Sequence, residues 1–170
     1  MERFFLAALC RAPGVGSRVA ASLVRVFGSA QDAWHARAEA LRAAHLSPER
    51  AAALHDFCRR NEALPEKIAA ACEKGGISLF VPSDEAYPAR LKEIYNPPQT
   101  LFCRGSLDCL KHPAVAMVGA RHASAYGKGA AEDIALGLAE RGFVVVSGAA
   151  RGIDTASHRG ALKAGATVAV

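Results

Sequence analysis

Two short apolar runs that each end in glycine constrain the fold of this chain more than any other feature. The first covers residues 114–118 and ends at Gly119, and the second covers residues 143–147 and ends at Gly148. Helical patterns follow them at about 127–141 and 153–164, and residues 167–170 begin a third apolar run. Apolar strands that alternate with helices are typical of a parallel sheet. Residues 114–170 are therefore predicted to form the first half of a Rossmann-like α/β fold, truncated after its third strand.

The preceding residues divide into two further predicted segments. Residues 1–75 form a small all-α domain of four or five short helices, with breaks at Pro13-Gly14, Gly28-Ser29, Ser47-Pro48 and Pro65. Ser47 is the expected N-cap of one helix and Pro48 its first residue. Residues 76–113 form a connector, with strands predicted at 77–81 and 100–104 and a short helix at 87–94.

Composition narrows the classes of protein that this chain can be. Twenty-one basic and 16 acidic residues give a net charge of +5, which both halves share and which is compatible with a nucleic-acid partner. No apolar run approaches the roughly 20 residues that span a bilayer, and no signal peptide is present, so we expect a cytoplasmic protein. The five cysteines form no C-x-x-C pair, which favours reduced thiols over a disulfide framework or a zinc site.

The loop after the first apolar run is the first candidate binding site. Ligands of open parallel sheets bind beyond the carboxyl ends of the strands, beside helix N-termini. After Gly119, Arg121 could hold a phosphate with two hydrogen bonds, Ser124 could donate a hydrogen bond or cap the helix, and Tyr126 could stack on a base. The alternative is that Arg121 only pairs with a carboxylate.

The loop after the second apolar run is the other candidate. Arg151 adds a second guanidinium, and small residues allow backbone amides to approach a ligand at Ser147, Gly148 and Gly152. Asp154 and His158 are four residues apart and so share one face of the following helix. The alternative is that Asp154 only complements the helix N-terminus and that His158 is a partly buried hydrogen-bonding residue.

Two enzymatic interpretations of these loops are disfavoured by the sequence. A hydrolytic Ser147, His158 and Asp154 triad would need a G-x-S-x-G turn, but Val145 stands at the first glycine position. A dinucleotide-binding fingerprint would need a third glycine where Glu132 stands. We therefore expect no catalytic residue, no cofactor and no metal.

A third candidate lies in the helical domain, at a short turn that resembles the hairpin of helix-hairpin-helix modules. Gly14 and Gly16 could expose backbone amides to a DNA phosphate, and Arg18 would add a positive charge. The alternative is that the hairpin only joins two packed helices.

Three passages, in this order and spacing, resemble the DNA-processing protein A (DprA/Smf) family. They are Tyr87-Pro88 through Leu101-Phe102 to Gly105, then Val118-Gly119-Ala120-Arg121 with Ser124, Tyr126 and Gly127, then Ser147-Gly148 through Ala150-Arg151-Gly152-Ile153-Asp154 to His158. Arg121 matches the phosphate-binding arginine of the family's G-S/T-R motif, and residues 147–154 match its S-G-L-A-x-G-I-D passage. Ala120 and Ala149 depart from that pattern.

The resemblance implies a protein that binds single-stranded DNA without altering it chemically. Such a protein protects incoming DNA and helps to load the RecA recombinase during natural transformation. It also implies a helical domain of the SAM or helix-hairpin-helix type, and a homodimer in the complete protein. Two alternatives remain open at this point: a Rossmann enzyme that processes nucleotides or nucleoside phosphates with the same loops, and a protein-interaction fragment with a vestigial pocket.

Overall fold

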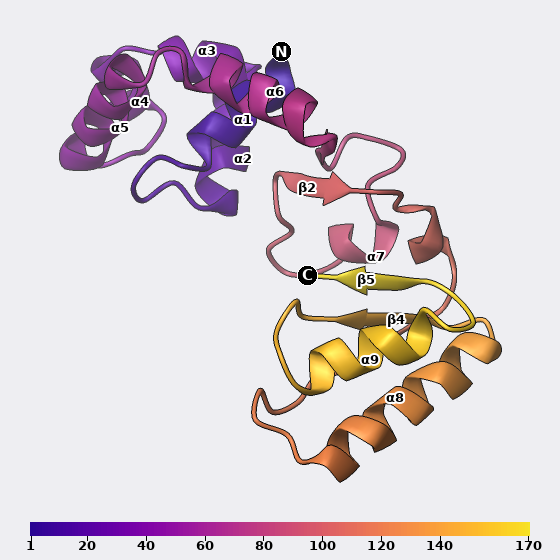
Figure 1. The fold of residues 1–170 in the computed structure, drawn as a ribbon. Helices are drawn as coiled ribbons and strands as arrows, with labels where there is room; N and C mark the ends of the chain where they lie inside the picture. Colours follow the sequence, from indigo (N-terminus) through magenta and orange to yellow (C-terminus); the bar gives the residue numbers. More distant parts are fainter. The chain divides into compact units, whose positions relative to one another are not determined.

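The computed structural model describes residues 1–170 and divides them into two compact units, Met1–Ser106 and Leu107–Val170 (Figure 1). The first unit combines seven α-helices with a two-stranded sheet, and the second combines two α-helices with a three-stranded sheet. None of the helices has the length and apolar character needed to cross a membrane.

Six helices form the amino-terminal part of the first unit. They are α1 (Glu2–Leu9), α2 (Ser17–Phe27), α3 (Ala30–His35), α4 (Ala38–Ala43), α5 (Pro48–Arg60) and α6 (Leu64–Gly75). The sequence predicted four or five, because the break between α3 and α4 contains neither glycine nor proline. The extended backbone of Ala36 and Arg37 makes that break.

Local sequence signals explain several helix boundaries. The Ser47 hydroxyl accepts a hydrogen bond from the Arg50 amide at 3.4 Å, and Pro48 begins α5, as predicted. Helices α2 and α6 end at Gly28 and Gly76, whose φ angles of 85° and 59° lie in the left-handed region that glycine adopts without a steric penalty.

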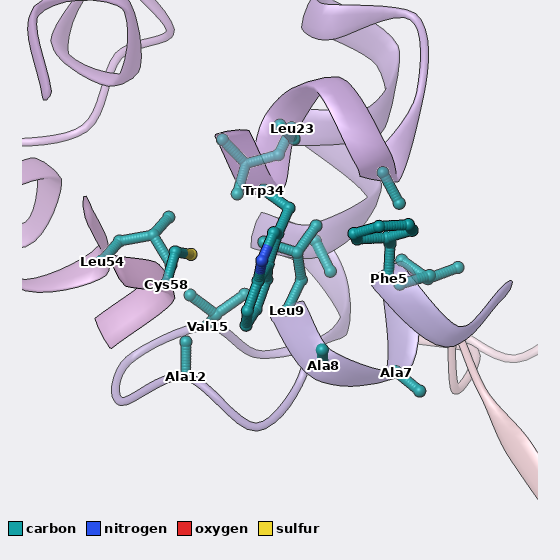
Figure 2. Packing of buried hydrophobic residues seen from close by; sticks show 14 of the residues in the cluster. Phe5, Ala7, Ala8, Leu9, Ala12, Val15, Leu23, Trp34, Leu54 and Cys58 are labelled. Atoms are coloured by element: carbon teal, nitrogen blue, oxygen red, sulfur yellow. The ribbon is translucent and has the colours of Figure 1, made fainter. Parts of the chain in front are cut away.

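The core of these helices is centred on Trp34, which is only 2% exposed (Figure 2). Its ring meets Phe5 and Phe57 edge to face, with centroid separations of 6.5 and 6.1 Å. Leu9 and Leu54 belong to the same buried cluster. Burying each large apolar side chain contributes about 1.5–3 kcal/mol, so this packing is a main source of stability for the first unit.

Residues 76–106 belong to the same unit as the six helices. Strands β1 (Ile77–Phe80) and β2 (Leu101–Arg104) pair antiparallel, with Leu79 opposite Phe102. Helix α7 covers only Ala89–Lys92, shorter than the predicted 87–94. Tyr87 is instead buried beside the helix, where its hydroxyl donates to the Pro98 carbonyl at 2.8 Å.

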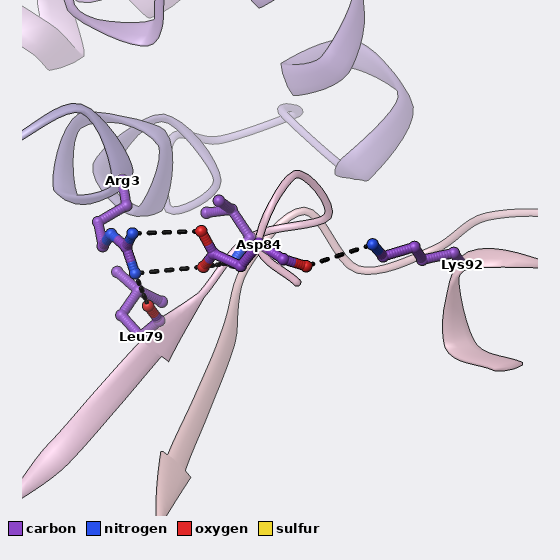
Figure 3. A network of polar contacts seen from close by, with 5 residues as sticks. Arg3, Leu79, Asp84 and Lys92 are labelled. Atoms are coloured by element: carbon purple, nitrogen blue, oxygen red, sulfur yellow. Dashed lines mark hydrogen bonds and ion pairs between the residues drawn. The ribbon is translucent and has the colours of Figure 1, made fainter. Parts of the chain in front are cut away.

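A polar network fastens α1 to the turn after β1 (Figure 3). The Arg3 guanidinium forms two hydrogen bonds of 3.2 Å with the Asp84 carboxylate and donates to the Leu79 carbonyl at 2.6 Å. Lys92 donates to the Asp84 carbonyl at 3.3 Å. The first helix of the chain is therefore tied to a segment about eighty residues later in the sequence.

The second unit confirms the predicted parallel sheet. After a short 3₁₀ helix, η1 (Asp108–Lys111), the elements are β3 (Ala114–Ala116), α8 (Ala125–Glu140), β4 (Val144–Ser147), α9 (Ile153–Ala161) and β5 (Thr167–Ala169). The strand order is β3-β4-β5 and all pairs are parallel. Residues 117–119, predicted as the end of the first strand, lie beyond β3, although the Met117 amide still donates to Val146.

Helices α8 and α9 lie on the same side of this sheet (Figure 1). Ala135, Ala139 and Ala161 form a small core with Val145, which is fully buried. Gly160 allows close helix packing, because a Cβ atom there would collide with the Glu132 carbonyl of α8. Val146 points to the opposite face and is only half-buried, so the sheet is covered more fully on its helix side.

Candidate functional site

An open hollow of about 980 Å³ lies beyond the carboxyl ends of the three parallel strands. It is lined by residues 121–123 after β3, by Lys128 in the first turn of α8, by residues 148–152 after β4, by Asp154 of α9, and by Val170. Its position is the one at which parallel α/β sheets bind ligands. The two loops singled out in the sequence therefore meet at one site.

Glycine brings these two loops into contact. The Ile153 amide donates to the Ala120 carbonyl at 3.3 Å. Gly152 has φ 90°, and a Cβ atom there would collide with the carbonyl oxygens of Ala120 and Arg121. A Cβ on Gly119 would lie 2.6 Å from Ile153 Cγ1. Any larger residue at either glycine would push the loops apart.

Arg121 and Arg151 both line the hollow, and both are exposed. Neither lies within ion-pair distance of a carboxylate, since the ion pairs of the chain involve other residues. The structure therefore does not contain the carboxylate pairing that was the alternative for Arg121. Two guanidinium groups without a carboxylate partner share one rim and can both attract an anion.

The remaining predicted residues of the first loop lie outside the lining of the hollow. Ser124 caps α8, because its hydroxyl accepts a hydrogen bond from the Gly127 amide at 3.1 Å. Tyr126 is 86% exposed in the first turn of the same helix. Gly119 acts through its small size, as described above. Of the two roles considered for Ser124, the structure shows capping.

In the second loop, Gly148 and Gly152 line the hollow, whereas Ser147 does not. Ser147 is buried, and its hydroxyl donates to the Met117 carbonyl at 2.6 Å. This bond holds the end of β4 against the segment that follows β3. Ser147 therefore stabilises the two loops through this hydrogen bond and does not line the hollow.

His158 holds the second loop in place. Its Nε2 donates to the Gly148 carbonyl at 2.9 Å, and its Nδ1 lies 2.7 Å from Thr167 Oγ1 in β5. The ring thus bridges the loop and the neighbouring strand, and it is not paired with Asp154. The interpretation of His158 as a partly buried hydrogen-bonding residue is confirmed.

The structure adds Lys128 and His122 to the predicted residues of the hollow. Lys128 follows the Ser124 cap by one helical turn, and this spacing from a predicted cap was a signal that could have identified it. His122 follows Arg121 directly and carried no signal beyond its place in the loop. With Lys128 included, three fixed positive charges surround the hollow.

Glu132 of α8 does not neutralise the three positive charges of the hollow, because it is paired with another residue. Glu132 forms an ion pair with Lys163 at 2.5 Å, and the Lys163 ammonium group lowers the pKa of the Glu132 carboxyl. Among the residues that line the hollow, Asp154 is the acidic one. Nowhere in the chain do three or more His, Cys, Asp or Glu side chains gather as they would around a metal ion.

The hairpin of the helical domain belongs to the first unit, whereas the residues that line the hollow belong to the second. Gly14 has φ 74°, and its carbonyl accepts a hydrogen bond of 2.5 Å from Arg50. Gly16 is the N-cap of α2. Arg18 donates to the Tyr95 hydroxyl at 3.2 Å, and its guanidinium carbon lies 5.4 Å from the centre of that ring. Arg18 is thus held by an exposed aromatic side chain.

The fold and the site define a class: a mixed α/β protein with a cationic hollow at the carboxyl edge of a parallel sheet. The model of the family described as DNA recombination-mediator protein A matches residues 78–170. The chain belongs to this DprA/Smf family.

Individual relatives agree with this assignment. DNA processing protein DprA of Streptococcus pneumoniae is 50% identical over 88 residues, which cover 51% of this chain and 31% of that protein. Protein Smf of Synechocystis is 30% identical over 99% of this chain and 44% of its own length. The crystal structure of S. pneumoniae DprA superposes with a TM-score of 0.76 at 29% identity, over 100% of this chain and 57% of that one. The chain spans less than two thirds of the length of each of these relatives.

Proposed function

We propose that the second unit is the first half of a Rossmann-like fold that binds single-stranded DNA. In this proposal Arg121, Lys128 and Arg151 attract consecutive phosphates to the hollow. The observation that carries the proposal is that these three cations line one hollow and that none has a carboxylate partner. Charged side chains held at one rim supply the sequence-independent part of nucleic-acid affinity.

The biological role that we propose draws on the family. The family model carries the description of a recombination mediator, and several relatives are named DNA processing proteins. We propose that the protein protects incoming single strands in the cytoplasm and helps to load RecA onto them, without changing the DNA chemically. In its complete form it acts as a homodimer. RecA loading is tested by comparing the rate at which RecA filaments form on a labelled strand with and without the protein.

DNA binding is tested by fluorescence anisotropy with an oligothymidine of about 20 nucleotides, long enough to fill a site of the usual size. Arg121→Glu should weaken binding at least tenfold, since it replaces an attractive charge with a repulsive one. The matched control is Arg141→Glu: Arg141 follows the opposite end of α8, about 24 Å from the start of the helix, and donates only to the Gly137 carbonyl. Equal affinity of Arg121→Glu and Arg141→Glu would contradict the proposal.

One observation favours a second candidate function, a small enzyme that acts on nucleotides or nucleoside phosphates. Asp154 places a carboxylate in the same hollow, where it could serve as a general base. Incubation with nucleotides separates the two functions: the enzyme would convert them and be stabilised by them. The DNA-binding protein would leave them intact.

A further inference from the structure

Tyr95 of the first unit is an exposed aromatic residue that a guanidinium holds from one side. The residue follows α7 in the chain and is 87% exposed. Arg18 of α2 donates to its hydroxyl at 3.2 Å, and the guanidinium carbon lies 5.4 Å from the ring centre. A cation in this position is attracted to the face of the ring. Because the ring is so exposed, its other face remains open to solvent.

The segment that carries Tyr95 is restrained by its neighbours. Pro97 and Pro98 follow it, and their rings fix their own φ angles. The buried Tyr87 hydroxyl donates to the Pro98 carbonyl at 2.8 Å, which ties the segment to the interior of the unit. Together with the Arg18 contact, these restraints position the Tyr95 ring before a ligand arrives. Such preorganisation lowers the entropic cost of binding.

Helix α2, which supplies Arg18, carries positive charge only. It contains Arg18 and Arg25, both exposed, and no acidic residue. The two arginines are seven residues apart, so they lie on one face of the helix, about 10.5 Å from each other along its axis. Glu93 is the acidic residue nearest to Tyr95 in the sequence. Neither arginine forms an ion pair with it or with any other carboxylate.

An exposed aromatic ring beside unpaired cations suits the chemistry of a single-stranded nucleic acid. The faces of unpaired bases stack on aromatic rings, and the phosphates are attracted to guanidinium groups. Tyrosine and arginine are also frequent in protein interfaces. The uniform positive charge of α2 and the DNA binding proposed for the second unit favour a DNA strand over a protein partner.

We infer that Tyr95 and Arg18 form a second contact site for single-stranded DNA, in which one base stacks on the open face of the Tyr95 ring and the arginines of α2 attract phosphates. The inference rests on the proposed DNA binding and goes beyond it, since none of these residues lines the hollow. Every base has a face that can stack, so this site should add affinity without a base preference.

The test measures fluorescence anisotropy with an oligothymidine of about 20 nucleotides and with an abasic strand of the same length. Tyr95→Leu should weaken binding to oligothymidine about fivefold or more, as expected for the loss of one stacked base, and should change binding to the abasic strand by about twofold or less. Tyr95→Phe keeps the ring and should retain most of the affinity. The matched control is Phe102→Leu, which removes another exposed aromatic ring of the same unit and should bind normally.

A cross-link locates the stacked base in the unmodified chain, without a substitution. A strand with 5-iododeoxyuridine in place of thymidine, irradiated in complex with the chain, should become attached at Tyr95, as detected by mass spectrometry of the digested protein.

Three results overturn the inference. They are an affinity for oligothymidine that Tyr95→Leu leaves unchanged, which would leave the pair to a protein partner, an equal loss of affinity for both strands, and cross-links confined to the second unit. If Arg121→Glu weakens binding and Tyr95→Leu does not, the inference fails and the proposed function stands. If the unmodified chain binds neither strand, both fail.

Discussion

The Ile153 amide donates a hydrogen bond of 3.3 Å to the Ala120 carbonyl, and this bond joins the two loops that carry Arg121 and Arg151. The loops follow different strands, so their arginines reach a common rim only because the chain approaches itself closely there. Gly152 makes that approach possible, since no side chain separates its backbone from the carbonyls of the first loop.

Gly152→Ala should therefore damage both stability and DNA binding. The new Cβ atom would collide with the Ala120 and Arg121 carbonyls, and alanine is strained at φ 90°. We expect a loss of about 2 kcal/mol or more in the free energy of unfolding, measured by urea denaturation. Gly129→Ala is the matched control, because a Cβ atom on Gly129 of α8 meets nothing. It should leave stability unchanged or raise it by about 0.5–1 kcal/mol.

Lys128→Gln should reduce the dependence of DNA binding on salt. Log affinity falls linearly as log salt concentration rises. Loss of one phosphate contact to a single strand makes this negative slope shallower by about 0.7. The measurement is a set of anisotropy titrations between low and moderate salt. Lys67→Gln, on the exposed face of α6, is the control and should not change the slope. An unchanged slope for Lys128→Gln would remove Lys128 from the phosphate contacts.

Much of the second unit could be predicted from the sequence because its signals are local. Apolar strands that end in glycine fixed the positions of β4 and the two candidate loops, and a serine before α8 marked its cap. Hydrogen bonds between residues far apart in the sequence could not be predicted from such local signals. Ser147 and His158 carried the right residue types for a site, but their partners Met117, Thr167 and Gly148 lie ten or more positions away or on another strand. Only the folded chain shows that both residues support the loops.

The network of Arg3 and Asp84 should stabilise the first unit (Figure 3). Arg3→Gln removes two hydrogen bonds to the carboxylate and the bond to the Leu79 carbonyl, so we expect a loss of about 1 kcal/mol, limited by partial exposure to solvent. A double-mutant cycle with Asp84→Asn measures the coupling. Strictly additive effects of the two substitutions would show that the pair contributes nothing.

Stability at alkaline pH should depend on Cys58, which is buried in the helical core. Burial raises the pKa of its thiol from 9.0 to about 12. The contribution of the neutral thiol is complete below pH 9 and is lost as the pH rises toward 12, because the unfolded chain releases the proton first. Urea midpoints at pH values on both sides of 9 should fall more steeply for the natural chain than for Cys58→Ala. Parallel falls would contradict this account.

The central claim is that Arg121 and Arg151 serve one binding site, and a short strand tests it most directly. Hexathymidine offers only a few phosphates, so its affinity depends mainly on the cations of a single hollow. Anisotropy titrations with Arg121→Gln and Arg151→Gln should each show binding weakened about tenfold or more, as expected for the loss of a charge-assisted contact worth about 1.5–3 kcal/mol, while Arg141→Gln binds normally. If hexathymidine loses affinity in only one of the two variants, or in neither, the two arginines do not form a common site.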